Sequence, residues 1–296
     1  MIGVDWGTSN ARAYRLAPGG PAGPVVLDQR EAALGILHVP PGGFPDALRR
    51  LAGDWIAAGE RRVLLAGMVG SRQGWLEAPY LPCPAGLDAL AGALVPVPFE
   101  GAEVRLVPGI SAEDGSGVPE VMRGEEVQVL GLDGGTEPDA LFCLPGSHSK
   151  WVRVRQGRIA GFETSLTGEA YAALRDHTIL GRMMEGDAAP GPAFDAGVAR
   201  AADPGGLLHH LFGTRTLALF GRLGPADGAS YLSGLLIGHE VRSSMPRDEQ
   251  VNLIGTGPLT ALYARAVAAC GGGALQAHPL LAARGLALIG ERAAWP

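Results

Sequence analysis

The sequence predicts an α/β protein of two lobes that repeat one topology, with a mixed sheet in each. Two short apolar segments surround a polar glycine turn within residues 1–16, and a second pair surrounds a similar turn at 145–149. A third strand and then alternating helical and strand patterns follow each pair. A charged, glycine-rich stretch lies between the two copies, so we expect an N-terminal lobe of residues 1–135 and a C-terminal lobe of residues 136–296.

The composition is typical of a globular protein and argues against several functional classes. The chain has 296 residues, 47% hydrophobic and 18% charged, which is enough for two domains of ordinary size. Its net charge of −6 offers no basic footprint for nucleic acid. It has neither an apolar run that could span a membrane nor a basic leader, so we expect a cytoplasmic protein. Three widely separated cysteines indicate neither a disulfide framework nor a zinc site.

The apolar periodicity predicts the order of elements within each lobe. In the first lobe we expect strands within 1–16 and at 25–27, a helix at 44–59, a strand at 62–66, a helix at 87–94, a strand at 104–107 and a helix at 119–132. In the second we expect strands at 140–144, 150–154 and 159–164, helices from 167 onwards and between 194 and 245, a strand at 251–254, a helix from 258, a strand near 275 and a C-terminal helix.

The first turn carries unusual chemistry. Asp5 ends the first strand, and Thr8, Ser9 and Asn10 follow it around Gly7. A carboxylate, two hydroxyls and an amide suit a hydrated divalent cation beside a phosphate. A plain hairpin with a hydrogen-bonded polar turn is the alternative.

The second turn strengthens the first interpretation, because Ser147, His148, Ser149 and Lys150 offer hydroxyls and a cation at the equivalent place. Turns that faced a shared crevice could hold one polyphosphate from both sides. His148 is equally suited to a structural hydrogen bond. Residues 255–257, Gly-Thr-Gly before a helix, suit a ribose or phosphate, although this pattern is also a common packing solution. Neither a Walker A sequence nor a full G-x-G-x-x-G is present.

Glu125 lies near the middle of an apolar face in the helix predicted at 119–132. It either reaches solvent beside Arg123, or borders a cleft where burial raises its pKa and makes it a base for a substrate hydroxyl. Glu126 and Arg123 are predicted to lie off that face, as its polar rim.

These features resemble a known superfamily, that of sugar kinases, heat-shock 70 ATPases and actin, with DWGTSN at 5–10 similar to its first phosphate motif. More narrowly, the chain resembles the 2-dehydro-3-deoxygalactonokinase family. The motifs that carry this resemblance cover nearly the whole chain: AGMVGS at 66–71, GW at 74–75, APYLP at 78–82, VMRGEE at 121–126, LPGSHSKW at 144–151, LTGE at 166–169 and LSGLLIG at 232–238. The family usually has Thr where this chain has Ser147, which keeps the hydroxyl.

The resemblance implies ribonuclease-H-like lobes with mixed five-stranded sheets flanking a nucleotide cleft. It also implies ATP- and Mg²⁺-dependent phosphorylation of the C6 hydroxyl of 2-dehydro-3-deoxy-D-galactonate in galactonate catabolism. The partners would be ATP and a sugar acid; the sequence leaves open whether the chain forms a homodimer. Alternatives are an ATPase module driving a protein partner, a kinase for another 3-deoxy-2-keto sugar acid, and a sugar-acid binder without catalysis.

The site residues expected on this basis fall into three groups. Glu125 is the preferred base, with Asp5 as the alternative, and Asp5 would orient Mg²⁺ through water. The sugar acid would meet the loop 68–75, particularly Met68, Ser71 and Trp75, and Arg123 would grip its carboxylate. The ATP-binding residues would be Thr8, Ser9, Asn10, Ser147, His148, Ser149, Lys150, Gly168, Gly255, Thr256 and Gly257.

Overall fold

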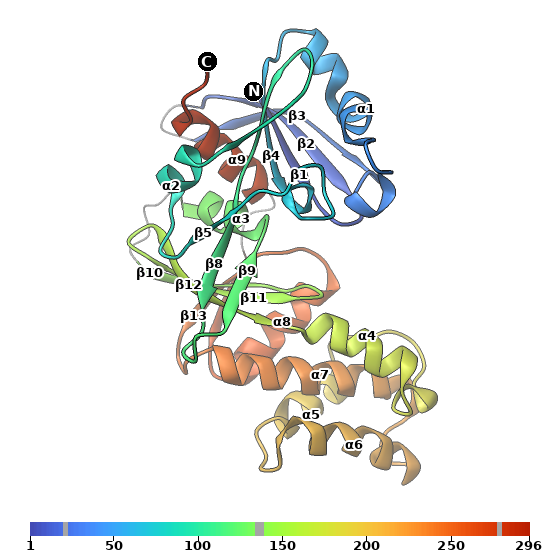
Figure 1. Cartoon of the computed structure of the whole chain (residues 1–296). Coiled ribbons are helices and arrows are strands. Elements are labelled where there is room, and N and C mark those ends of the chain that lie inside the picture. The colour runs from blue at the N-terminus through green and yellow to red at the C-terminus, as the bar shows by residue number, and fades with distance from the viewer. Residues whose placement is uncertain (20–22, 134–138, 277–279) are drawn as a thin grey trace. The chain divides into compact units, whose positions relative to one another are not determined.

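The computed structural model describes residues 1–19, 23–133, 139–276 and 280–296, and confirms the predicted α/β class (Figure 1). Two compact units are present. The first comprises Met1–Asp139, Val152–Phe162 and Leu280–Pro296, and the second Ala140–Trp151 and Glu163–Pro279. The predicted boundary between residues 135 and 136 lies outside the described residues.

The first sheet has six strands in the order β3-β2-β1-β4-β7-β6. β1, β2 and β3 are antiparallel, whereas β1, β4 and β7 run parallel. The prediction of five strands is wrong here, because Val95–Val97 pairs antiparallel with β7 and adds an edge strand. The bounds are β1 Ile2–Trp6, β2 Ala11–Ala17, β3 Val25–Ala32, β4 Arg62–Gly67, β6 Val95–Val97 and β7 Glu103–Leu106.

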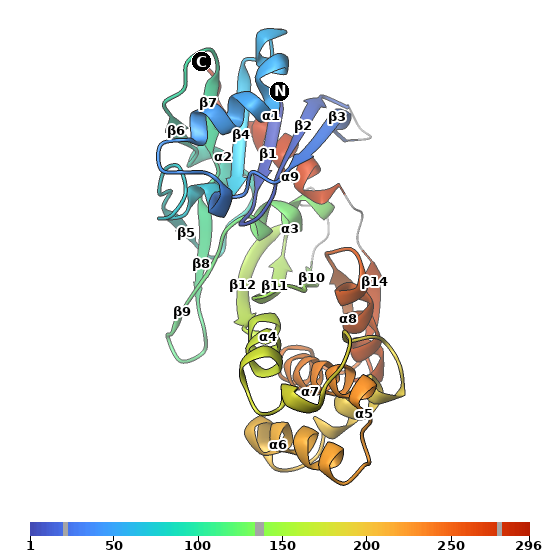
Figure 2. The same ribbon diagram turned by 90° about the vertical axis from the view of Figure 1, so that its right-hand side faces the viewer.

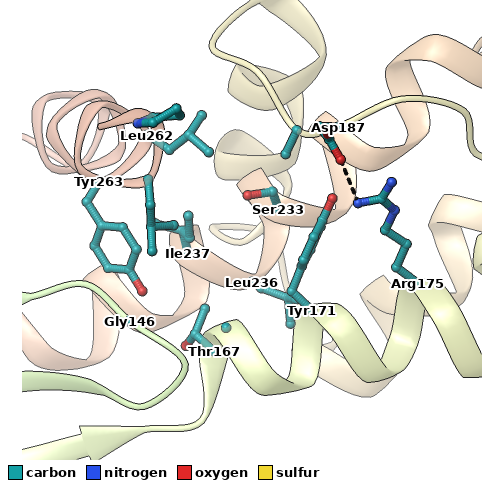
Figure 3. Close-up of a pocket in the computed structure, with 14 residues that line it drawn as sticks. Gly146, Thr167, Tyr171, Arg175, Asp187, Ser233, Leu236, Ile237, Leu262 and Tyr263 are labelled. Atoms are coloured by element: carbon teal, nitrogen blue, oxygen red, sulfur yellow. Dashed lines mark hydrogen bonds and ion pairs between the residues drawn. The ribbon is translucent and has the colours of Figure 1, made fainter. Parts of the chain in front are cut away.

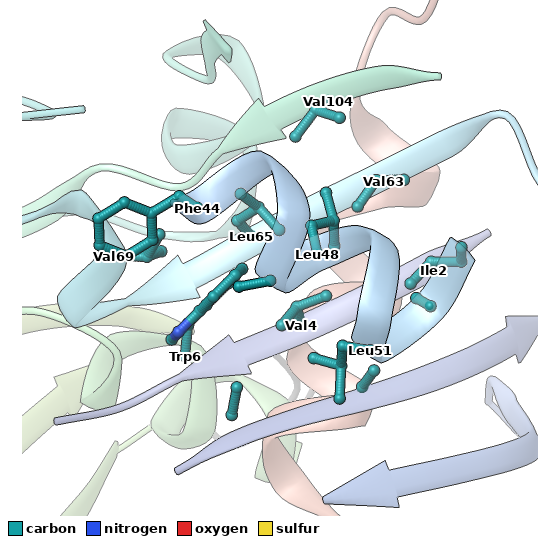
Figure 4. Close-up of a cluster of buried hydrophobic side chains, with 14 of the residues drawn as sticks. Ile2, Val4, Trp6, Phe44, Leu48, Leu51, Val63, Leu65, Val69 and Val104 are labelled. Carbon is teal, nitrogen blue, oxygen red and sulfur yellow. The ribbon is translucent and has the colours of Figure 1, made fainter. Parts of the chain in front are cut away.

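Helices cover this sheet. α1 (Phe44–Ala57) places Phe44, Leu48 and Leu51 in the hydrophobic core formed with strand residues such as Val4 and Trp6 (Figure 4). α9 (Leu281–Arg292) packs against β1, β2 and β4, and it also packs against α3 (Glu125–Asp133). These contacts explain why the C-terminal helix belongs to the first unit, although the predicted division assigned it to the second lobe.

A small third sheet corrects the helix predicted at 119–132. β5 (Tyr80–Pro82), β8 (Gly109–Glu113) and β9 (Pro119–Met122) form it in the order β5-β8-β9. Residues 119–122 pair antiparallel with β8, and Gly124, with φ +108°, precedes the start of α3 at Glu125. The apolar residues of 118–122 therefore never share a helix face with those of α3. The first unit also contains η2 (Ile36–His38), η3 (Met68–Gly70) and α2 (Leu87–Gly92).

The second sheet has the predicted five strands, in the order β12-β11-β10-β13-β14. This order repeats the first five positions of the first sheet, with β10, β13 and β14 parallel. The strands are β10 Asp139–Leu144, β11 Ser149–Arg155, β12 Arg158–Ser165, β13 Gln250–Leu253 and β14 Gly273–Gln276. The structure thus confirms the duplication of topology.

The second unit adds a layer of helices around α7 (Pro225–Ser244), which packs against α4, α5, α6 and α8 (Figures 1 and 2). A Cβ at Gly234 would lie 2.1 Å from the carbonyl oxygen of Phe194, so glycine there lets α5 and α7 approach closely. The other bounds are α4 Thr167–His177, η4 Gly181–Met183, α5 Pro192–Arg200, α6 Gly206–Leu219 and α8 Pro258–Ala269. None of the described helices has the length and apolar character needed to cross a membrane.

Candidate active site

The first turn is held firmly by backbone hydrogen bonds. The carbonyl groups of residues 7–9 accept hydrogen bonds of 2.9–3.1 Å from the N–H groups of residues 35–37. A Cβ at Gly35 would lie 2.2 Å from the backbone of Ser9, so only glycine fits there. Asn10 donates from Nδ2 to Glu31 at 3.0 Å. Thr8 and Ser9 are exposed on this fixed turn, and their hydroxyls are available to a ligand.

Asp5 lies on β1 opposite Arg12 of β2. Burial raises the pKa of Asp5 to about 6; nearby Glu125 and Glu31 raise it further, whereas Arg12 opposes them. Arg12 is itself paired with Glu31 at 3.1 Å. A divalent cation would offset this repulsion between carboxylates, so the surroundings of Asp5 fit the metal role predicted for it.

The start of α3 brings Glu125 to the carboxyl ends of β1 and β4. A Cβ at Gly124 would lie 3.0 Å from the Cα of Gly67, and a Cβ at Gly67 would lie 2.7 Å from the carbonyl oxygen of Trp6. Both glycines have positive φ. Open α/β sheets bind their ligands at this edge, so Glu125 and Asp5 occupy a position suited to chemistry.

The two carboxyl groups of α3 differ in burial. Glu125 is partly exposed and accepts a hydrogen bond from the backbone N–H of Arg123 at 3.0 Å. Glu126 is fully buried and accepts from the N–H of Gly124 at 2.7 Å. Burial and the charge of Glu125 raise the pKa of Glu126 to about 8. The prediction that Glu126 and Arg123 form an exposed rim is therefore wrong, because α3 starts later than expected and turns Glu126 inward.

Arg123 is a buried cation that has unpaired hydrogen-bond donors. Its side chain is 7% exposed, Nη2 donates to the carbonyl of Ala78 at 2.8 Å, and the guanidinium lies 4.4 Å from the ring centre of Tyr80. Nε and Nη1 have no hydrogen-bond partner among the described residues, and neither does the buried Oγ of Ser71. Buried donors are rarely left unpaired, so this pattern fits a site for an anionic ligand.

The loop predicted to meet the sugar acid is partly structural. A Cβ at Gly70 would lie 3.0 Å from Nη1 of Arg123, so the structure brings this loop and Arg123 together. Trp75 stacks on Phe44, with ring centres 6.2 Å apart, and meets Phe99 edge-on at 6.1 Å. Met68 and Trp75 both pack against the core of the first unit. These contacts favour a supporting role for Trp75.

The second turn lies against the start of α4. A Cβ at Gly168 would lie 2.4 Å from the carbonyl oxygen of Gly146, and the N–H of Glu169 donates to the carbonyl of Ser147 at 3.0 Å. His148 Nε2 pairs with Glu169 at 2.5 Å. Ser147 and His148 are exposed, so a phosphate could reach both; the hydrogen bond to Glu169 also serves a structural role.

A buried network supports the strand that leaves this turn. Glu240 of α7 accepts hydrogen bonds from Trp151 Nε1 and Tyr263 Oη, both at 2.7 Å, and from Ser149 Oγ at 3.4 Å. The hydroxyl of Thr167 also bonds to it, and desolvation raises the pKa of Glu240. The network thus links the strand after the second turn to the start of α4 and to the middle of α8. Ser149 is fully buried, and hence the prediction that it contacts phosphate is disfavoured by its position.

Lys150 is the only lysine in the sequence. It is 6% exposed, and no hydrogen bond or ion pair engages its ammonium group within the described residues. Its Nζ is not among the buried polar atoms that lack a partner, so the ammonium group reaches solvent and is accessible to an anion such as phosphate.

Beside the network lies a cavity of about 230 Å³, bounded by α4, α7 and α8 (Figure 3). Gly146 and Gly168 line it, as do Tyr171, Ile237 and Tyr263. Arg175 and Asp187 form an ion pair of 3.0 Å at one end. Residues 255–257 do not line it, but Pro258, which follows them, does. Sequence reasoning did not assign Tyr171, Ile237 or Tyr263 to a site, since apolar residues at helical spacing look like core, although Ile237 lies within the LSGLLIG motif at 232–238.

Gly257, with φ +85°, precedes α8, and a side chain there would be strained although nothing lies within 4 Å of its Cβ position. Across the described ranges, no group of three or more His, Cys, Asp or Glu side chains could hold a metal ion. Mg²⁺ typically uses one or two carboxylates with waters and phosphates, so Asp5 alone remains compatible with it.

Comparison with known proteins decides the family. A family described as 2-keto-3-deoxy-galactonokinase matches residues 5–289. The chain belongs to this family. It is 35% identical to the "Probable 2-dehydro-3-deoxygalactonokinase" of Rhizobium meliloti, covering 99% of this chain and 97% of the relative. It is 33% identical to the 2-dehydro-3-deoxygalactonokinase of Escherichia coli, covering 91% and 90%. The resemblance identified from sequence motifs is confirmed, and the chain is a kinase that uses ATP.

Solved structures agree with the family. A Sinorhizobium meliloti crystal structure bearing the 2-dehydro-3-deoxygalactonokinase name superposes with a TM-score of 0.88 at 34% identity, covering 98% of both chains. An activator of 2-hydroxyisocaproyl-CoA dehydratase from Clostridium difficile, with bound ADPNP, reaches a TM-score of 0.50 at 12% identity, covering 99% of this chain and 95% of that one. This second likeness shows only that the galactonokinase family shares its fold with a wider group.

Proposed function

We propose that this chain transfers the γ-phosphoryl group of ATP to the C6 hydroxyl of 2-dehydro-3-deoxy-D-galactonate, in the cytoplasm, as a step of galactonate catabolism. The observation that supports this most directly is Arg123. A buried guanidinium with Nε and Nη1 unpaired, close to Gly70 in the loop that also carries the unpaired hydroxyl of Ser71, matches the carboxylate of a sugar acid. Arg123 would hold that carboxylate and so orient the distant hydroxyl.

ATP is proposed to bind with its adenosine in the cavity between α4, α7 and α8. The cavity has apolar walls from Leu236, Ile237 and Leu262 and an ion pair at one end, and a volume of about 230 Å³ suits an aromatic base. Gly168 and residues 255–257 would border the ribose. The phosphates would then meet Ser147, His148 and Lys150.

The chemical step needs a base and charge neutralisation. Glu125 accepts the proton of the C6 hydroxyl, the hydroxyl oxygen bonds to the γ-phosphorus, and the bond to the bridging oxygen breaks to release ADP. Thr8 and Ser9 donate hydrogen bonds to the γ-phosphate. Mg²⁺, when bound, neutralises phosphate charge, and Asp5 would hold it through water. Glu125 suits the role of base because it is partly exposed, whereas Glu126 is buried and its raised pKa keeps it protonated near pH 7.

Measuring ADP release tests the proposal. We expect turnover only when a 3-deoxy-2-keto sugar acid is present, with the galactonate-derived compound preferred over its gluconate-derived epimer. Release without any sugar acid would indicate an ATPase, and a preference for the epimer would reassign the substrate.

The role of Arg123 has its own test. Arg123→Met should raise the KM for the sugar acid about 100-fold, since a charge-assisted pair is lost, and leave the KM for ATP unchanged. An analogue whose carboxylate is replaced by an amide serves as the control. The wild-type enzyme should discriminate strongly against the amide, and the variant should not. Equal discrimination by both enzymes would remove Arg123 from the carboxylate site.

A further inference from the structure

The small third sheet, formed by β5, β8 and β9, brings an aromatic ring next to Arg123 (Figure 1). β5 carries Tyr80, and Gly109 of β8 lies directly opposite it in the strand pairing. β9 ends at Met122, so Arg123 is the next residue along the chain. The guanidinium carbon of Arg123 lies over the Tyr80 ring, 4.4 Å from its centre. Each strand of the sheet therefore contributes to the surroundings of one cation.

The Tyr80 ring occupies the space that a side chain on β8 would otherwise fill. A Cβ at Gly109 would lie 2.7 Å from Cδ1 and Cε1 of the ring, and 2.6 Å from the carbonyl oxygen of Met122. Both distances are too short for a real side chain, so glycine at this position leaves room for the ring. The pairing of β5 with β8 thus sets where the ring lies, with Arg123 over its face.

A single hydrogen bond within the described residues holds the side chain of Arg123. Nη2 donates to the carbonyl of Ala78, whereas Nε and Nη1 have no hydrogen-bond partner there. One hydrogen bond lets a guanidinium group turn about it, and the ring of Tyr80 limits this rotation. An aromatic face attracts the cation without accepting a conventional hydrogen bond. The ring therefore leaves Nε and Nη1 free for the oxygens of a ligand.

We propose that Tyr80 is a positioning residue of the sugar-acid site, which holds the guanidinium group of Arg123 in the orientation that receives the substrate carboxylate. This inference rests on the proposed function. A ring that served only the hydrophobic core would be buried, whereas Tyr80 is 40% exposed. Ala78, two residues before Tyr80, links the same place to the loop 68–75, since its N–H donates to the carbonyl of Gly70 at 3.0 Å. Tyr80, Arg123 and that loop thus form one connected support for the carboxylate.

Steady-state kinetics of two Tyr80 variants test the role of the ring. Tyr80→Leu keeps an apolar side chain but loses the aromatic face, so the KM for the sugar acid should rise about tenfold, with a smaller fall in kcat and an unchanged KM for ATP. Tyr80→Phe restores the ring and should bring that KM back to within about twofold of the wild-type value. Val121→Ala, at an exposed position of β9 in the same sheet, is the control and should leave the KM unchanged. A normal KM in Tyr80→Leu, or an equal rise in Tyr80→Phe, would overturn the proposal.

The double variant separates positioning of Arg123 from a general loosening of the sheet. If Tyr80 acts through Arg123, Tyr80→Leu should change kcat/KM for the sugar acid by less than about twofold once Arg123 is replaced by Met. A loss of the same size in both backgrounds would show that Tyr80 acts independently of Arg123, and the proposal would be wrong.

The wild-type enzyme separates this inference from the proposed function. If it turned over no 3-deoxy-2-keto sugar acid, both would be removed. Normal wild-type turnover with discrimination against the carboxamide analogue, together with an unchanged KM in Tyr80→Leu, would remove this inference alone.

Discussion

The two turns that open the duplicated sheets share a topology but differ in chemistry. Around the first turn the charged groups are mostly acidic. Glu31 and Glu125 lie close enough to Asp5 to help raise the pKa of its carboxyl group. After the second turn, β11 carries the cation Lys150, and the carboxylate of Glu240, which bonds to other residues of β11, is satisfied by four donors. The same backbone arrangement therefore presents opposite charge in the two units.

This difference suggests how a duplicated fold divides one reaction. Phosphoryl transfer needs anion binding at the phosphates, and it needs carboxylates for the metal and the attacking hydroxyl. The first turn combines carboxylates with neutral hydroxyl donors, and the second adds the lysine cation, so the base does not have to lie beside that cation and lose basicity. Separation into two copies lets each local environment set its own pKa values. Substitutions on each side can test whether the two turns hold these separate roles.

The largest effect is expected from Asp5→Asn. Removing the carboxylate that we propose holds the metal should lower kcat about 1000-fold or more. The fold should survive, because burying the charged form of Asp5 already carries a cost that Asn avoids. Steady-state kinetics and thermal unfolding measure the two effects. Substantial retained activity would remove Asp5 from the metal site.

Asp5 also gives a pH dependence. Its pKa of about 6 means that the carboxyl is protonated below that pH and cannot hold a cation. We expect kcat/KM to rise between pH 5 and 7 with an apparent pKa near 6. A flat wild-type profile across that range would contradict the assignment.

Glu125→Gln should have the next largest effect, lowering kcat about 100-fold with little change in the KM for ATP, since a positioned base contributes about that much. Glu126→Gln is the matched control, adjacent in sequence and identical in size change. Because Glu126 is already protonated near pH 7, Gln should change kcat by less than about threefold. If the control is the damaging change, the base is Glu126.

The sequence predicted the duplication correctly, because alternating apolar strands and the two glycine turns are local signals. It misassigned residues 119–122 for a physical reason. Val118, Val121 and Met122 fit a helical period by chance, but their conformation is decided by antiparallel pairing with β8, a tertiary contact. The shift of the helix start then exchanged the expected burial of Glu125 and Glu126.

Site residues could be predicted where the residue type within a motif was itself informative. They could not be predicted where the role depends on contacts with residues distant in sequence. Asp5, Lys150 and Arg123 stood out from the motifs. The role of Glu240 could not be seen, because its partners come from β11, α4 and α8, distant in sequence. For the same reason Trp75 looked like a ligand residue until its packing against Phe44 was known.

Glu240→Gln tests the role of the second turn, because Glu240 is the centre of the hydrogen-bond network that supports it. The amide would place a donor where Trp151 Nε1 or Tyr263 Oη needs an acceptor, and would loosen the start of α4 against the turn. We expect the KM for ATP to rise about tenfold while kcat falls less, because under the proposed function the network supports the nucleotide site and takes no part in the chemical step. Glu163→Gln is the control, because it makes the same change at an exposed position of β12 that belongs neither to the cavity lining nor to the network. A loss of kcat with normal KM would place Glu240 in the chemical step.

The smallest expected effect is on stability: Glu126→Gln should hardly change turnover, but it should change how the free energy of unfolding depends on pH. The pKa of Glu126 is raised to about 8 in the folded state, so between pH 6 and 8 the folded protein keeps a proton that the unfolded chain has lost. Stability from this group therefore falls as pH rises, by up to about 1.4 kcal/mol for each pH unit. Gln cannot ionise, so the variant should lose this part of the decline. Thermal midpoints of the wild-type protein and the variant at pH 6, 7 and 8 measure this decline. Parallel curves for the two proteins would mean that Glu126 is ionised in the folded enzyme, so that the surroundings of the first turn carry one more negative charge than the burial of Glu126 suggests.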